Sequence, residues 1–236
     1  SAAALTRFPR VDRIDVFSDG FVRLDEAMAD DLSVVNAARV SFGTRREAMD
    51  ERDEGLIGFL MRERHGTPFE HNAFRFHVRA PIFVMREWIR HRVGSFNELS
   101  GRYAKIDDAF YVPALEDVRT QVGKPGSYTF ESVPMDLAEQ TRATIEESYR
   151  SAYAAYEAML ADGVAKEVAR SVLPVGIMTE FYWTLNARSL MNFLSLRNQE
   201  HAQREIRRYA EAVEALFETR MPITHRCFVE HGRRAP

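Results

Sequence analysis

Alternation of apolar and polar residues identifies a few short strands in this chain. In residues 73–79, Phe74 and Phe76 alternate with basic side chains, and a two-residue period is typical of a strand with one buried face. Residues 180–185 repeat this pattern. Apolar residues on both sides of Ser18-Asp19-Gly20 predict a hairpin. The strands predicted in this way cover residues 13–17, 21–24, 73–79 and 180–185.

Apolar residues spaced three or four apart predict that most of the chain is helical. Asp30 or Asp31 can cap one helix and Asn186 another, because such side chains accept backbone N–H groups. Pro81 suits the first turn of a helix that runs to an Arg-His-Arg triplet and is followed by a loop. The helices predicted cover residues 32–39, 54–64, 81–92, 134–163, 165–173, 187–196 and 202–221.

Helices dominate and strands are few, so we expect an α+β fold. We expect one helix-rich domain over residues 1–236, with a small antiparallel sheet. Glycine and proline in residues 121–127 predict a loop, and Pro222 is expected to end the last long helix. Gly66 is available to close helix 54–64. The inward side of that helix is predicted to carry Leu56, Ile57, Phe59 and Leu60.

Composition limits the classes of function. The 236 residues are 45% hydrophobic and 28% charged, as in a globular protein with one sizeable core. A net charge of −3 gives no general attraction to nucleic acid or to an anionic membrane, so any anion site must be built locally. A single cysteine excludes an internal disulfide and suits the cytoplasm. The apolar run in residues 1–7 is too short for a signal peptide, and no segment is apolar enough to span a membrane.

Residues 90–102 concentrate groups that bind anions or move protons. Arg90, His91 and Arg92 stand together, and Glu98 and Arg102 follow within thirteen residues. One interpretation is a pocket for a ligand with phosphate and polar ring edges, where guanidinium groups bind oxygens in pairs. The alternative is a charged helix end followed by a solvated loop.

Three other groups of residues have either a functional or a purely structural interpretation. Arg188 and Asn192 share one helix face, as do Arg197 and His201, and these faces bind a ligand or are simply solvated. The histidines and glutamate of residues 65–71 lack the spacing of a metal site, so we expect no metal. Cys227 is a nucleophile or, as is commoner, an inert buried thiol.

The segment 90–102 matches the pattern Arg-His-Arg-x-x-Ser-x-Asn-x-x-Ser-x-Arg at every fixed position. In this it resembles the flavin-dependent thymidylate synthases. Other segments resemble that family in the same order along the chain, over roughly residues 30–225. They are His65-x-Thr67-Pro68-x-Glu70-His71, Ala169-Arg170-x-x-Leu173-Pro174, Asn186-Ala-Arg-Ser-Leu-x-Asn192, Arg197 and His201-Ala-Gln.

The resemblance implies an enzyme that methylates dUMP to dTMP in the cytoplasm. Methylenetetrahydrofolate would supply the carbon, FAD reduced by NADPH the hydride, and no enzyme nucleophile would be needed. The active sites of the family form where subunits of a homotetramer meet. By resemblance, the FAD-binding residues are Thr67, Arg90, His91, Arg92, Glu98, Asn186, Ala187, Arg188, Asn192 and His201. The dUMP-binding residues are Glu87, Trp88, Ile89, Arg90, Glu98, Leu99, Ser100, Gly101, Arg102, Arg170 and Arg197.

Particular roles follow from side-chain chemistry. Arg102 and Arg170 suit a phosphate clamp, and Arg197 suits stabilisation of negative charge on the uracil edge, which activates C5. His65 and His201 are expected to face the flavin or the folate. Many relatives carry Gln where Glu87 stands, and a carboxylate cannot donate the amide hydrogen bond. Residues 105–134 carry no motif that we can interpret.

Two other hypotheses stay open at this point. A cysteine-dependent thymidylate synthase would require Cys227 as its nucleophile. A nucleic-acid or nucleotide-binding module would use Arg90, Arg92 and Arg102 on phosphates, which the net charge disfavours.

Overall fold

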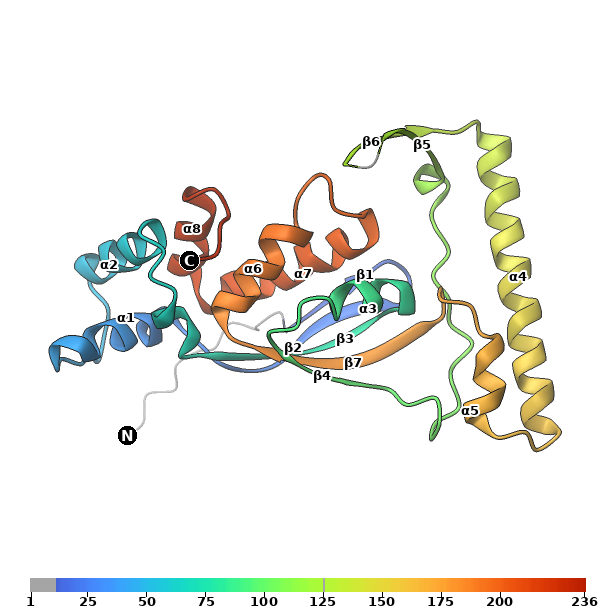
Figure 1. The fold of residues 1–236 in the computed structure, drawn as a ribbon, viewed down its shortest axis with the longest axis horizontal. Coiled ribbons are helices and arrows are strands. Elements are labelled where there is room, and N and C mark those ends of the chain that lie inside the picture. The colour runs from blue at the N-terminus through green and yellow to red at the C-terminus, as the bar shows by residue number, and fades with distance from the viewer. Residues whose placement is uncertain (1–11, 125) are drawn as a thin grey trace, which may run out of the picture. The chain divides into compact units, whose positions relative to one another are not determined.

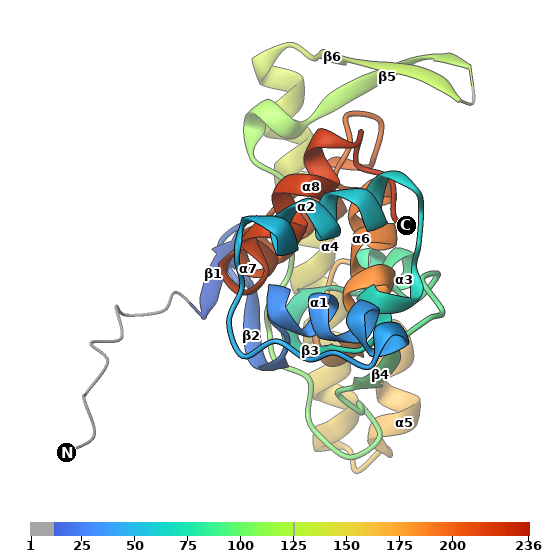
Figure 2. The same cartoon turned by 90° about the vertical axis from the view of Figure 1, so that its left-hand side faces the viewer.

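The computed structural model describes residues 12–124 and 126–236, and its helices and separate strands confirm the α+β prediction. The N-terminal stretch on which a signal peptide was judged lies outside these residues. Contacts group the chain into two compact units, which Figures 1 and 2 show as ribbons. Of the described residues, unit 1 comprises 12–80, 84–98 and 180–236, and unit 2 comprises 81–83, 99–124 and 126–179. The expectation of a single domain stays a prediction.

A five-stranded sheet in the order β1-β2-β3-β7-β4 forms the base of unit 1. The β1/β2, β2/β3 and β4/β7 pairs are antiparallel. All four predicted strands are present, but residues 95–98, predicted to lie in a loop, form a short strand paired with β7. The strands are β1 Arg13–Val16, β2 Gly20–Met28, β3 Ala73–Pro81, β4 Ser95–Glu98 and β7 Met178–Leu185.

Helices α3, α6 and α7 cover one face of this sheet (Figure 1). Their contact with it is largely aromatic. The ring of Trp88 on α3 stacks on Phe193 of α6 and meets Trp183 of β7 edge-on, and all three are fully buried. The helices of the chain are α1 Asp31–Arg39, α2 Glu51–Arg62, α3 Ile82–Trp88, α4 Met135–Ala161, α5 Lys166–Ala169, α6 Ala187–Arg197, α7 Arg204–Arg220 and α8 Pro222–Glu230. No helix of the described residues is long and apolar enough to cross a membrane.

Three details of helix 54–64 were predicted wrongly. The helix, α2, begins at Glu51, because Asp50 and Asp53 form a capping box that the apolar pattern does not reveal. Phe59 is 42% exposed, so it does not belong to the inward side. Gly66 does not close the helix either; Arg64 adopts the left-handed conformation there, with φ 57°.

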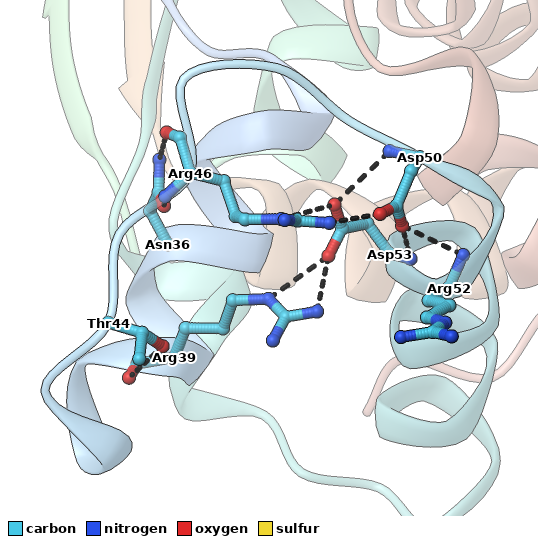
Figure 3. Close-up of polar contacts among 7 residues, drawn as sticks. All are labelled: Asn36, Arg39, Thr44, Arg46, Asp50, Arg52 and Asp53. Atoms are coloured by element: carbon cyan, nitrogen blue, oxygen red, sulfur yellow. Dashed lines mark hydrogen bonds and ion pairs between the residues drawn. The ribbon is translucent and has the colours of Figure 1, made fainter.

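A buried carboxylate fixes the chain between α1 and α2, as Figure 3 shows. Asp53 is fully buried and accepts hydrogen bonds from Arg39 Nε at 3.0 Å and Arg46 Nε at 3.1 Å. The backbone of Arg46 is in turn held by the Asn36 amide, at 2.7 and 3.1 Å. Two arginines therefore satisfy a charge that burial would otherwise make very costly.

Pro222 was predicted to end the last long helix, but it also starts a further helix, α8. Proline is favoured in the first turn of a helix because it lacks the N–H that would go unpaired there. The other free N–H groups of α8 are taken by buried Asp31 of α1. Its carboxylate accepts from the backbone of Ile223 at 3.0 Å and from the backbone and hydroxyl of Thr224 at 2.8 and 2.6 Å.

Unit 2 contains the long helix α4 and a hairpin. Strands β5 Arg119–Lys124 and β6 Ser127–Ser132 occupy most of the region predicted as a loop, and Gly123 lies within β5, paired with Tyr128. The core of unit 2 is built on Tyr153 and Tyr156 of α4 with Ala169 and Ile177. Leu137, expected on the apolar face of α4, is 46% exposed.

Candidate functional site

Arg197, at the last position of α6, lies at the centre of a polar cluster in unit 1. It donates from Nη1 to the Glu87 carboxylate at 3.0 Å and from Nη2 to the Glu87 carbonyl oxygen at 3.4 Å. Its Nε donates to Nε2 of His91 at 3.0 Å. Glu87 lies in the last turn of α3, which ends at Trp88 and not at residue 92 as predicted, so the Arg-His-Arg triplet follows the helix and His91 lies three residues beyond it.

Burial controls the protonation of both partners. Desolvation raises the pKa of Glu87, and Glu205 adds to the effect, although the charge of Arg197 opposes it. Desolvation, assisted by the charge of Arg197, lowers the pKa of His91 to about 4. His91 is therefore neutral near pH 7. Because its Nε2 accepts a hydrogen bond, the ring proton is on Nδ1.

A second cluster joins residues 65–71 to the start of α6. Arg188 forms an ion pair with Glu70 and donates from Nε to the carbonyl oxygen of Pro236 at 2.7 Å. The Arg188 side chain passes so close to Gly66 that a Cβ there would lie 2.5 Å from Nε. Asn192, one turn further along α6, is exposed on the same helix face.

A buried asparagine that sequence reasoning missed holds this cluster together. The side-chain oxygen of Asn72 accepts from the backbone N–H of Ala187 at 2.7 Å, and its amide donates to the Phe69 carbonyl at 3.2 Å. Asn186 accepts from the Ser189 N–H at 2.9 Å, which confirms it as the cap of α6. The two motif segments thus meet through backbone groups as well as through charges.

Unit 2 carries a separate arginine pair. Arg102 forms an ion pair with Glu167 at 2.9 Å, with both side chains more than half exposed. A Cβ on buried Gly101 would lie 3.1 Å from Cδ of Arg170, so the loop that carries Arg102 packs directly on Arg170. The Ser100 carbonyl oxygen accepts from the backbone N–H groups of Tyr103 and Ala104 at 3.0 Å, which turns the chain at this point.

The remaining site candidates divide by exposure. Trp88 and Ala187 are fully buried, so at most their backbone could reach a ligand. Ile89 and Leu99 are each 43% exposed. The others at the surface of the described chain are Thr67, Arg90, Arg92, Glu98, His201 and His65.

His65 and Cys227 are the remaining side chains considered for metal binding or nucleophilic attack. No group of three His, Cys, Asp or Glu side chains that could hold a metal is found among the described residues. His65 packs edge-on against Phe59, with ring centroids 5.6 Å apart. Cys227 is 5% exposed, and burial raises the pKa of its thiol, so it is a poor nucleophile.

The chain is similar to known proteins over most of its length. Residues 23–223 match the thymidylate synthase complementing protein family. The chain is 47% identical to a flavin-dependent thymidylate synthase of Streptomyces coelicolor, over 98% of this chain and 100% of the relative. A second, of Thermotoga neapolitana, is 46% identical over 93% and 95%. The chain belongs to the flavin-dependent thymidylate synthase family.

Membership of this family makes the chain a flavin-dependent methyltransferase of dTMP biosynthesis. Solved structures of Streptomyces cacaoi PolB, described as a UMP/dUMP methylase, share the fold. The complex with 5-Br UMP has a TM-score of 0.86 at 43% identity and covers 94% of this chain and 99% of PolB. The complex with 5-Br dUMP has the same TM-score at 44% identity.

Proposed function

We propose that the chain converts dUMP to dTMP by reductive methylation, with methylenetetrahydrofolate as the carbon donor and NADPH-reduced FAD as the hydride source. The observation that carries the proposal is the orientation of Arg197 by Glu87 and His91. A guanidinium held in advance can stabilise charge that develops on a ligand without a cost of reorganisation.

The donors of Arg197 define what it can bind. A guanidinium has five N–H groups, and three of them are used within the cluster, by His91 and by the side chain and backbone of Glu87. Two N–H groups stay available for the uracil N3–C4=O edge, where O4 accepts and N3 can accept only in the anionic form of the ring. Negative charge stabilised at that edge makes C5 of the ring electron-rich, so it can take the one-carbon unit without attack by an enzyme nucleophile.

FAD, when bound, would supply the hydride for this reduction. The donor set around α6 suits a ligand with phosphates and a polar ring: Arg188, Asn192 and Thr67 are all exposed, and the absence of a side chain at Gly66 leaves the room that Arg188 fills. These residues, with Arg90, Arg92 and Asn186, would hold it. Arg188 is already paired with Glu70, which keeps its guanidinium from swinging into solvent.

Arg102 and Arg170 of unit 2 would clamp the phosphate of dUMP. Their proximity across Gly101 offers two forks to one dianion. The pairing of Arg102 with Glu167 is exposed and therefore weak, so a phosphate can replace the carboxylate at little cost.

We further propose a homotetramer with its sites at subunit interfaces. Every residue of strands β5 and β6 is exposed, including the apolar side chains of Val122, Tyr128 and Phe130. A two-stranded hairpin with apolar side chains in water is marginally stable and gains from a partner surface. Light scattering should give a mass about four times 27.1 kDa. A monomer at micromolar concentration would contradict this.

A spectrum and a product assay test the proposed function. The purified protein, reconstituted with FAD, should show flavin absorption. With dUMP, methylenetetrahydrofolate and NADPH it should form dTMP, detected by mass spectrometry. Cys227→Ala should retain full activity, because the thiol is buried away from the cluster. A protein that binds no FAD, or forms no dTMP, would overturn the proposal.

The same assay should be run with UMP, because the PolB structures concern a UMP/dUMP methylase. Equal turnover of UMP and dUMP would broaden the substrate to both nucleotides.

A further inference from the structure

We propose that His91 is a positioning residue for Arg197, which it holds by accepting a hydrogen bond from Nε through a neutral ring. The inference rests on the proposed function only for its kinetic consequence. The contact itself is a property of the free protein. It assigns to His91 a role towards another side chain, whereas the family resemblance implies contact with FAD alone.

The His91 ring is fixed from two sides. Its backbone N–H donates to the Trp88 carbonyl at 3.0 Å, which continues the turn after α3. Its ring meets Phe193 edge-on, with centroids 5.0 Å apart and planes at 74°. Phe193 is fully buried and stacks on Trp88, so the ring rests on the aromatic core. The direction of Nε2 is therefore set by packing and not by the ligand.

The two partners of Arg197 act on different atoms. Glu87 accepts one hydrogen bond from Nη1 with its carboxylate and one from Nη2 with its carbonyl oxygen. If nothing held Nε, the guanidinium could still rotate about its long axis. The bond from Nε to His91 removes this freedom. A flat guanidinium needs both contacts to present its remaining N–H groups in one fixed plane.

Burial of the ring, with the charge of Arg197, favours the neutral form that this role requires. Arg197 of α6 faces Nε2, Glu87 of α3 lies on the other side of the guanidinium, and Glu205 of α7 acts on Glu87. A protonated ring could only donate, and it would repel the guanidinium. With Nε2 as acceptor, Nδ1–H stays available; no partner for Nδ1 is found in residues 12–124 and 126–236. That proton can serve a carbonyl or phosphate oxygen of a bound ligand.

Nitrogen NMR of the FAD-free and FAD-loaded protein tests the contact without any substrate. The ¹⁵N shifts should show His91 as the neutral Nδ1–H tautomer at pH 6.5. In Arg197→Gln the pKa of His91 should rise only part of the way from about 4, because desolvation, the larger cause of the low pKa, remains while the adjacent cation is gone. An Nε2–H tautomer of His91 in the wild type would overturn the proposal.

Two substitutions at His91 test the consequence for catalysis. His91→Phe keeps the packing on Phe193 but offers no acceptor, and at saturating FAD its kcat should fall roughly 10- to 100-fold. His91→Gln offers a carbonyl oxygen as acceptor and should recover most of that loss. His231→Phe, away from the cluster, is the matched control.

Three outcomes of the kinetic test count against the proposal. They are an unchanged kcat in His91→Phe, a loss confined to flavin binding, and a His91→Gln variant as poor as His91→Phe. If the wild-type chain does not methylate dUMP, the proposed function fails and the tautomer measurement still decides whether His91 holds Arg197.

Discussion

Arg197→Ala should lower the turnover of dUMP by at least about 10²- to 10³-fold and leave the flavin spectrum unchanged. Removal of one donor that stabilises a developing negative charge has an effect of this order. Among the residues that the structure describes, this guanidinium is the charged group that hydrogen-bonds to both Glu87 and His91. Steady-state kinetics with the FAD-loaded variant, at saturating folate and NADPH, measure the effect.

Two further variants show whether the loss is specific. Arg197→Lys keeps the charge but not the planar fork, so it should recover only a small part of the activity. Arg208→Ala removes an exposed arginine that pairs with Glu211 on α7, and it should behave like the wild type. If Arg197→Ala loses its flavin instead, Arg197 binds FAD and the assignment to the uracil edge is wrong.

Gly20→Ala should destabilise the protein by on the order of 3 kcal/mol, the range seen when a methyl group is forced into a packed core. A Cβ at this position would overlap the hydroxyl oxygen of Tyr209 and lie 2.6 Å from the carbonyl oxygen of Val16. Tyr209 is fully buried on α7, so the hairpin would have to move away from that helix. Denaturant unfolding monitored by circular dichroism gives the difference in the free energy of unfolding.

A second glycine provides the control for this prediction. Gly55 lies within α2, and a Cβ added there would have no neighbouring atom within 4 Å, so Gly55→Ala should be neutral or stabilising by up to about 1 kcal/mol. Tyr209→Phe in the Gly20→Ala background removes the overlapping oxygen and should restore part of the stability. The Val16 carbonyl stays in place, so the recovery is incomplete. Equal stability of Gly20→Ala and the wild type would show that the hairpin is not packed as described.

Helices and strands with one buried face could be predicted from the sequence, because apolar residues recur along that face at a regular spacing. The alternation of Phe74 and Phe76 gave β3, and Asn186 marked the start of α6. Elements that depend on single residues could not be predicted. Pro222 suits the end of one helix and the start of another, and only the carboxylate of Asp31, 192 residues before Ile223, decides between them.

The candidate site shows the same division. The motif gave Glu87, His91 and Arg197 as separate ligand contacts, each by resemblance. Their convergence could not be predicted, because 106 residues separate His91 from Arg197 and no periodicity links them. Asn72 is a single polar residue before a strand and belongs to no motif, so the sequence does not mark it. Its buried amide nevertheless joins two motif segments.

The discontinuity of unit 1 has a consequence for how the chain folds during synthesis. Residues 99–179 of unit 2 leave the ribosome as one continuous stretch, whereas unit 1 needs residues 180–236 before β7, α6, α7 and α8 can complete it. Until then β3 lacks its neighbour β7, and the carboxylate of Asp31 has no helix to cap. Strand edges and apolar faces of the first eighty residues are thus exposed while more than half of the chain is still being made, which is the period in which a nascent protein most needs a chaperone.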